Sequence, residues 1–335
     1  MTTSLTSLGL QFDDPELEAA IRTGLAAVET ALRDSVQSAD EFVAEAARYL
    51  IEAGGKRFRP LLTLLAAQFG LPDRHGVISS AVVCELTHLA TLYHDDVMDE
   101  ATVRRGAVAA NERWTNSVAI LTGDYLFARA SDLLADLGPE AVRIQARTFE
   151  RLVTGQIRET VGAKAGVDPI EHYLAVLADK TGSLIATAAE FGAMFAGVEA
   201  EAIASLRSFG EQVGVAFQIS DDILDIASDS GVSGKTPGTD LREGVPTLPV
   251  LYALRSTASD PDAVRLRELL SRPLTDDGEH AEALRLMRAS AALEQARDVV
   301  RTYAEAAEAA LSALPAVPAR AALIALTEHV IVRTA

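Results

Sequence analysis

The stretch HLATLYHDDVMDEATVRRG, residues 88–106, joins an apolar helical run to an acidic cluster. A second stretch of the same kind, GVAFQISDDILD, covers residues 214–225. Both contain the pattern D-D-x-x-D, at Asp95–Asp99 and at Asp221–Asp225. Residues four positions apart share one face of a helix, so the first and last carboxylates of each motif point the same way. Each motif therefore predicts a helix with an acidic face at its end.

Two acidic helix faces are suited to binding a hard divalent cation. Mg²⁺ typically takes one or two carboxylates together with substrate phosphates and waters. Two such faces across a cavity would form a metal clamp for a diphosphate. The alternative for one isolated motif is a solvated acidic surface, but two copies on apolar helices favour the metal site.

Helical periodicity extends outward from the two motifs over almost the whole chain, for example through residues 109–136 and 169–196. Asp14 and Pro15 are typical of a helix start, and Gly54 follows a helix as a natural stop. Strand-like alternation is nearly absent. Residues 228–246 form the one long irregular segment, and we expect them to act as a lid. These patterns predict an all-α fold with a single domain over residues 1–335.

Composition and charge restrict the class of protein. The chain of 335 residues has a formal net charge of −18, which argues against non-specific binding to nucleic acid or anionic membranes. The single Cys84 excludes disulfides and cysteine metal sites. The first ten residues do not resemble a signal peptide, and no apolar run predicts a transmembrane segment. We therefore expect a cytoplasmic protein, with at most a transient membrane contact for product release.

Basic clusters accompany the acidic motifs. GGKRFRP, residues 54–60, places three cations in a glycine-led turn, and Arg104 and Arg105 follow the first acidic motif. Glycine lets the backbone approach an anion closely, and Lys and Arg donate hydrogen bonds to phosphate. An acidic chain would repel a diphosphate unless local cations and metals reversed the field. The alternative for residues 56–59 is a solvated basic patch.

The combined pattern resembles the trans-isoprenyl diphosphate synthases, the polyprenyl synthetase family. The resemblance extends from about residue 54 to residue 249. It is carried, in the family's order, by GGKRFRP, HLATLYHDDVMDEATVRRG, LTGDYLFARA, LVTGQIRE, DKTGSLI, FQISDDILD and GKTPGTDLREGVPTLP. It implies a single-domain isoprenoid-synthase bundle of about a dozen helices around a central cavity, and assembly as a homodimer.

The resemblance assigns two diphosphate pockets. Four residues match the family's isopentenyl diphosphate site: Lys56, Arg59, His88 and Arg105. Five match its allylic diphosphate site: Arg104, Lys180, Thr181, Gln218 and Lys235. Each residue also has a structural alternative. His88 could be a core histidine, Gln218 could make a helix–helix contact, and Lys180 could be a surface lysine. Thr181 could bond to its own helix.

The resemblance also assigns the metal ligands and the reaction. Asp95, Asp99 and Asp221 match ligands for about three Mg²⁺ ions, while Asp96, Asp222 and Asp225 support them. His94 is expected to orient the carboxylates. The residues expected to act in catalysis are Asp95, Asp96, Asp99, Asp221, Asp222, Lys180 and Lys235. Metals and basic residues would stabilise the leaving diphosphate. The double bond of isopentenyl diphosphate would then attack the allylic carbocation.

Small residues before the first acidic motif bear on product length. Short-chain members of the family have an aromatic residue four or five positions before this motif, where the chain has Ala90 and Thr91. Thr87, Cys84 and Ser80 continue the same helix face for about 22 Å at 1.5 Å per residue. A deep tunnel would result, and with it a heptaprenyl to decaprenyl product. Close helix packing is the alternative, with a farnesyl or geranylgeranyl product.

Two other functions compete with chain elongation. A class I terpene cyclase also ionises a diphosphate at an aspartate-rich helix, but it has no need for the GGKRFRP turn. A non-catalytic subunit of a heteromeric synthase typically lacks the acidic motifs, and both are intact here. The sequence therefore favours a Mg²⁺-dependent prenyltransferase that condenses isopentenyl diphosphate with an allylic diphosphate.

Overall fold

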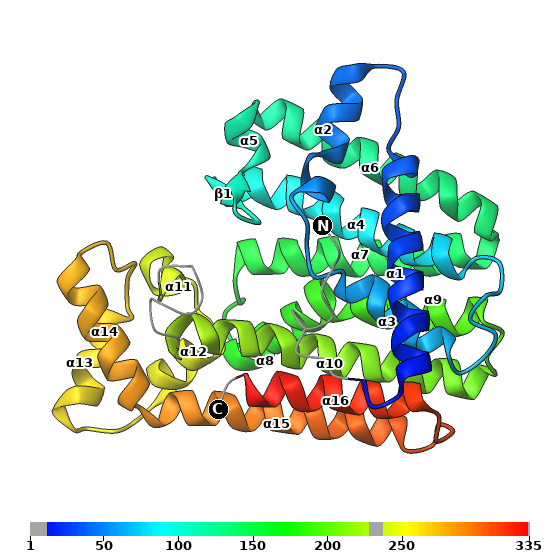
Figure 1. Cartoon of the computed structure of the whole chain (residues 1–335). Coiled ribbons are helices and arrows are strands. Elements are labelled where there is room, and N and C mark those ends of the chain that lie inside the picture. The colour runs from blue at the N-terminus through cyan, green and yellow to red at the C-terminus, as the bar shows by residue number, and fades with distance from the viewer. Residues whose placement is uncertain (1–11, 228–236, 334–335) are drawn as a thin grey trace. The chain divides into compact units, whose positions relative to one another are not determined.

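The computed structural model describes residues 12–227 and 237–333 (Figure 1). These residues form two compact units. The first unit contains the described residues up to Glu150 together with Leu184–Gly210 and Leu311–Leu326. The second unit contains Arg151–Ser183, the described part of Glu211–Ala310, and the chain from Thr327 to its last described residue. The single domain expected from the sequence stays a prediction, for which a single cooperative unfolding transition is the test.

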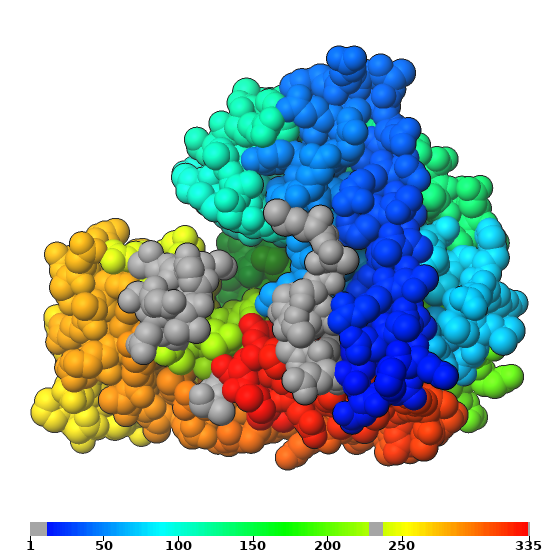
Figure 2. All heavy atoms as spheres, in the orientation of Figure 1, coloured from blue at the N-terminus to red at the C-terminus, as the bar shows by residue number. Residues whose placement is uncertain are grey.

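The first unit is built from helices and one small hairpin. Its elements are α1 (Pro15–Ser35), α2 (Glu41–Glu52), α3 (Phe58–Ala67), α4 (Val77–Met98), β1 (Val103–Arg104), β2 (Ala107–Val108), α5 (Ala110–Arg113), α6 (Asn116–Leu137), the start of α7 (Pro139–Val161), most of α9 (Ser183–Phe195), the start of α10 (Ala200–Ala227) and the first part of α16 (Pro318–Val332). Asp14 caps α1 by accepting a hydrogen bond from the amide of Leu17 at 2.8 Å, and Pro15 begins the helix. Figure 2 shows α1 lying along the molecular surface.

Helix α4 is the central element of the first unit. It packs along α6 and also contacts α1 and α3. Its apolar residues join a buried core that includes Leu86, Leu89 and Tyr93. The Tyr93 hydroxyl donates a hydrogen bond of 2.5 Å to the carbonyl of Ala46 in α2. Burial of these side chains fixes α4, and with it the acidic motif at its carboxyl end.

The regular elements among the described residues of the second unit are all helices. It contains the end of α7, α8 (Pro169–Leu177), the π-helix η2 (Ala178–Gly182), much of α10 (Ala200–Ala227), α11 (Thr239–Glu243), α12 (Leu248–Arg255), α13 (Pro261–Leu269), α14 (Asp277–Ala289), α15 (Ala291–Leu311) and the end of α16 (Pro318–Val332). Helix α8 contacts α12, and α13 pairs with α14. Asp168 caps α8 by accepting from the amide of Ile170 at 2.8 Å.

The structure confirms the all-α fold class and adds local detail. The predicted helix over 109–136 is interrupted at Trp114, where the backbone leaves the helical region before Thr115 caps α6. The predicted helix over 169–196 contains the π-helical turn η2. Within the expected lid, residues 228–236 lie outside the described residues, and Thr239–Glu243 form α11. Among the residues that the structure describes, no helix is long and apolar enough to cross a membrane.

Candidate functional site

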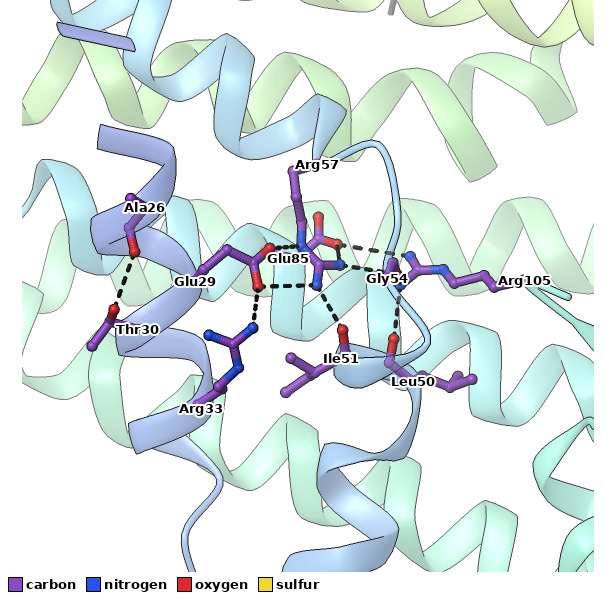
Figure 3. Close-up of polar contacts among 10 residues, drawn as sticks. All are labelled: Ala26, Glu29, Thr30, Arg33, Leu50, Ile51, Gly54, Arg57, Glu85 and Arg105. Carbon is purple, nitrogen blue, oxygen red and sulfur yellow. Dashed lines mark hydrogen bonds and ion pairs between the residues drawn. The ribbon is translucent and has the colours of Figure 1, made fainter. Parts of the chain in front are cut away.

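The GGKRFRP turn connects α2 to α3 with an unusual backbone. Gly55 has φ +146°, and a Cβ atom there would lie 2.9 Å from the guanidinium carbon of Arg105. Glycine therefore lets Arg105 lie across the turn. The guanidinium of Arg105 donates to the carbonyl of Leu50 at 3.0 Å and also to the carbonyl of Gly54 (Figure 3). A cation is thus fixed against the backbone of the turn.

The three cations of the turn have different environments. Lys56 is exposed, whereas the side chain of Arg57 is buried and points inward to Glu29 and Glu85 (Figure 3). Arg59 is partly buried, and its Nε atom is buried without a hydrogen-bond partner. An unsatisfied buried donor is costly, so this guanidinium is suited to receiving an anionic acceptor.

His88 lies on α4, one turn after Glu85, in the same basic environment. Burial lowers the pKa of His88 well below its usual range, and the charges of Arg59 and Arg105 lower it further. The imidazole is therefore neutral near pH 7 and can donate or accept a hydrogen bond. In the first unit, the positive charges of Arg59 and Arg105 therefore act on the imidazole of His88.

The first acidic motif ends α4. Asp96 is fully buried and accepts a hydrogen bond of 2.5 Å from Nε of Arg104, while its Oδ2 atom has no partner. The Asp99 carboxylate is 62% exposed and lies 3.9 Å from Nη2 of Arg104. Arg104, predicted to bind the allylic diphosphate, therefore contacts the acidic motif in this structure. Asp95, the first carboxylate of the motif, is half-buried.

His94, expected to orient the carboxylates of the first motif, contacts α6 in this structure. Its Nε2 atom lies 3.1 Å from the carbonyl of Ile120 and 3.4 Å from Oδ1 of Asp124, both on α6. A Cβ atom on Gly123 would lie 2.4 Å from the same Nε2 atom, so the close approach depends on glycine. His94 thus contacts α6, and the first acidic motif follows directly on α4.

Three of the predicted residues lie close together in the second unit, namely Thr181, Gln218 and Asp222. Thr181 lies in the π-helix η2, and its hydroxyl is 3.4 Å from Oε1 of Gln218 on α10. The Gln218 amide in turn donates to Oδ1 of Asp222 at 3.2 Å. Lys180 instead forms an ion pair with Glu159 at 2.5 Å. π-helical turns are frequent at functional sites, and the role of this segment stays a prediction.

The carboxylates of the second acidic motif have distinct partners. The Tyr173 hydroxyl donates to Oδ2 of Asp222. Burial raises the pKa of Asp222 to about 6, although the hydrogen bonds from Tyr173 and Gln218 act in the opposite direction. Asp225 accepts from the amides of Thr239 and Asp240 at 3.3 and 3.1 Å, so it holds the start of α11.

Asp221, the predicted metal ligand of this motif, is ion-paired with Arg333. The guanidinium of Arg333 also lies over the ring of Phe217, 4.8 Å from its centroid. One of its nitrogens, Nη1, is buried and has no hydrogen-bond partner. A cation therefore neutralises Asp221 in this structure.

The predicted metal ligands are carboxylates. Among residues 12–227 and 237–333, no three His, Cys, Asp or Glu side chains are grouped closely enough to hold a metal by themselves. Mg²⁺ commonly takes one or two carboxylates and completes its shell with substrate phosphates and waters. The oxygen donors of Asp95, Asp99 and Asp221 are of the kind this ion requires.

The predicted chain-length residues on α4 are closely packed. Ala90, Thr87, Cys84 and Ser80 are each 0% exposed, whereas Thr91 is partly exposed. The Thr87 hydroxyl accepts a hydrogen bond of 2.8 Å from the Gln145 amide of α7, whose Oε1 atom is buried without a partner. Burial raises the pKa of the Cys84 thiol to about 12, so the thiol stays protonated. The role of these residues in product length stays a prediction.

Several residues at the site were not predicted. Glu29 and Glu85 contact the basic turn, Tyr173 contacts Asp222, and Arg333 contacts Asp221. Their partners are distant in the sequence, so no local spacing could have identified them. Lys235, predicted to bind the allylic diphosphate, lies outside the described residues.

Comparison with known proteins agrees with the resemblance seen in the sequence. The family model described as polyprenyl synthetase matches residues 40–287. A nonaprenyl diphosphate synthase of Mycobacterium tuberculosis is 54% identical, and the alignment covers 97% of both chains. The structure of geranylgeranyl pyrophosphate synthase from Corynebacterium glutamicum, complexed with calcium and isoprenyl diphosphate, has a TM-score of 0.88 and 48% identity, covering 97% of this chain and 99% of that one. A decaprenyl diphosphate synthase structure from Rhodobacter capsulatus has a TM-score of 0.86 and 34% identity, covering 96% and 99%. The chain belongs to the polyprenyl synthetase family.

Proposed function

We propose that this protein is an all-trans polyprenyl diphosphate synthase that makes a long-chain product by successive condensation of isopentenyl diphosphate with an allylic diphosphate. The observation that carries the proposal is the basic turn at residues 54–60. Its Arg59 has a buried nitrogen without a partner, in a chain that retains both acidic motifs. The 54% identity with a nonaprenyl diphosphate synthase supports a long product.

The residues of the first unit are proposed to bind isopentenyl diphosphate. Arg59 and Arg105 donate to the phosphate oxygens, Lys56 adds a mobile charge from the exposed end of the turn, and neutral His88 adds a hydrogen bond. Because this diphosphate does not leave during the reaction, its pocket acts by orienting the double bond.

A second set of residues is proposed to act on the allylic diphosphate, namely Arg104, Lys180, Thr181, Gln218 and Lys235. Asp95, Asp99 and Asp221 are proposed to hold Mg²⁺, which would neutralise the charge that develops on the leaving diphosphate. Calcium and isoprenyl diphosphate in the Corynebacterium glutamicum structure support a divalent metal here. Arg333, which is ion-paired with Asp221, would leave that carboxylate and bind the incoming diphosphate instead.

The proposed reaction balances without a protein nucleophile. The carbon–oxygen bond of the allylic substrate breaks, and the electron pair leaves with the diphosphate. The isopentenyl double bond attacks the cation and forms the new carbon–carbon bond. One proton is then lost, and the departing diphosphate accepts it, which restores a double bond. The product is an allylic diphosphate one isoprene unit longer, so the cycle can repeat.

A shorter product is the second candidate. The Corynebacterium glutamicum protein is named a geranylgeranyl pyrophosphate synthase and is 48% identical to this chain. The complete burial of Thr87, Cys84 and Ser80 is also compatible with a closed floor beneath Thr91.

We also propose that the protein assembles as a homodimer, as the family resemblance implies, and that it is located in the cytoplasm.

Turnover by the purified chain alone tests the proposed function. Diphosphate release should require Mg²⁺ and both substrates together. Release from the allylic diphosphate alone, with formation of a hydrocarbon, would indicate a terpene cyclase instead. A chain that gains activity only with another protein would be a subunit of a heteromeric synthase.

A further inference from the structure

A buried ion network lies behind the basic turn of the first unit (Figure 3). Arg57 donates from Nη1 to Oε1 of Glu85 at 3.0 Å and from Nη2 to the carbonyl of Ile51 at 2.9 Å. Its Nε atom donates to Glu29 of α1. The side chains of Arg57 and Glu85 are each 2% exposed. Nη1 also donates to the carbonyl of Gly54 in the turn at 3.3 Å, so every side-chain nitrogen of Arg57 has a protein acceptor.

The backbone at Arg57 depends on these contacts. Arg57 occupies the N-cap position of α3, and its backbone lies in the left-handed region, with φ +51° and ψ +40°. This conformation is unfavourable for a residue with a side chain and persists only where the surroundings hold it. Lys56 and Phe58–Arg59 flank it directly, so the path of the chain through Arg57 decides where Lys56 and Arg59 point.

Glu85 also balances charge around the turn. Its Oε1 atom lies 3.8 Å from Nη2 of Arg105. Burial lowers the pKa of both Arg59 and Arg105, and Glu85 is the largest influence opposing that change. Several guanidinium groups in a poorly solvated region repel one another unless a carboxylate separates them. Glu85 therefore stabilises the basic turn before any anion binds.

We propose that Glu29, Arg57 and Glu85 form a clamp that positions the isopentenyl diphosphate pocket. They are positioning residues, because Arg57 is saturated by protein acceptors and the two carboxylates face it. The inference rests on the proposed function, since it concerns the affinity of that pocket. It follows that Glu29, a residue of α1 with no place in the pocket, controls the KM for isopentenyl diphosphate.

The substitution Glu29→Gln tests the clamp with little change in shape. It removes the charge and one acceptor from the contact with Arg57. The KM for isopentenyl diphosphate should rise about tenfold, the factor that corresponds to about 1.4 kcal/mol. The kcat and the KM for the allylic diphosphate should stay unchanged, because the acidic motifs are untouched. A loss of structure alone would instead lower the active fraction and leave both KM values as they are.

Arg33→Gln is the matched control. Arg33 contacts the same Glu29 carboxylate at 3.4 Å from the solvent side, where its side chain is 47% exposed. Its removal should leave both KM values unchanged. An equal effect of Arg33→Gln and Glu29→Gln would contradict the clamp, because any change around α1 would then suffice.

Arg57→Lys provides a second variant that keeps the charge. Lysine lacks the planar fork that reaches two carboxylates and a carbonyl together, so the KM for isopentenyl diphosphate should rise more than in Glu29→Gln. Unchanged KM values in folded Glu29→Gln would refute the clamp, even where Arg57→Lys fails to fold. A wild-type protein that turns over neither substrate would instead refute the proposed function. The two failures are therefore distinguishable.

Discussion

Thr91→Phe should shorten the product more than any other single change on α4. Thr91 is one helical turn, or about 6 Å, before Asp95, whereas Ser80 is about 22 Å away. A phenyl ring at Thr91 would therefore block the proposed tunnel close to the acidic motif, and products should stop at farnesyl or geranylgeranyl diphosphate. The initial rate of condensation should stay similar, because the acidic motif itself is unchanged.

The packing of α4 sets the expected cost in stability. Thr91 is partly exposed, so a larger side chain there has space on one side. Cys84 is 0% exposed and lies within the influence of Arg59 and Glu85, so Cys84→Phe should lose about 1–3 kcal/mol of stability by overpacking.

The assay is reversed-phase chromatography of the products, with a thermal unfolding curve for each variant. Cys84→Phe, if it remains folded, should give intermediate lengths. Unchanged product length in a folded and active Thr91→Phe enzyme would refute the small-residue face of α4 as the determinant of length.

Three further predictions concern the acidic motifs, the two pockets and pH. Asp221→Ala should lower kcat about 10²–10³-fold in saturating Mg²⁺, because one element that stabilises the leaving diphosphate is lost, and near-normal turnover would contradict the role of the second motif. Arg59→Ala should raise mainly the KM for isopentenyl diphosphate, and Lys180→Ala mainly that for the allylic substrate; equal effects on both substrates would contradict the pocket assignment. Since the pKa of His88 is depressed in the folded state, the unfolded chain binds the proton first, and stability falls below about pH 6.5 by about 1.4 kcal/mol per pH unit. Denaturant unfolding at pH 7 and pH 5.5 should therefore show a smaller acid loss in His88→Gln than in the wild type, and an equal loss would contradict this.

The helix ends that are set by local capping residues were predicted from the sequence. Asp14 with Pro15 begins α1, Asp168 begins α8, and Gly54 follows the end of α2, as capping rules suggest. The apolar runs before both acidic motifs are helical, as their periodicity predicted. The interruption at Trp114 was missed because the residues around it, NERWTNS at 111–117, contain no Gly or Pro to mark a break, although Thr115 carried a capping signal.

The contacts that tie distant segments together were not predictable. Glu29 and Glu85 lie 28 residues before and after Arg57, and nothing in the spacing of KRFR shows that its middle cation turns inward. The π-helical turn at Thr181 likewise has no signature in a pattern of apolar residues. The resemblance to the family supplied the roles of Lys56 and Arg59, and the structure adds that Arg57, between them, is bound to buried carboxylates.

Product analysis of the purified chain tests the proposed function most directly. The protein would be incubated with Mg²⁺, isopentenyl diphosphate and an allylic diphosphate. The products would be separated by reversed-phase chromatography, and their masses would be determined by mass spectrometry. The proposed function predicts linear all-trans diphosphates in the heptaprenyl to decaprenyl range. Accumulation of farnesyl or geranylgeranyl diphosphate as the final product, or of a cyclic hydrocarbon, would contradict it.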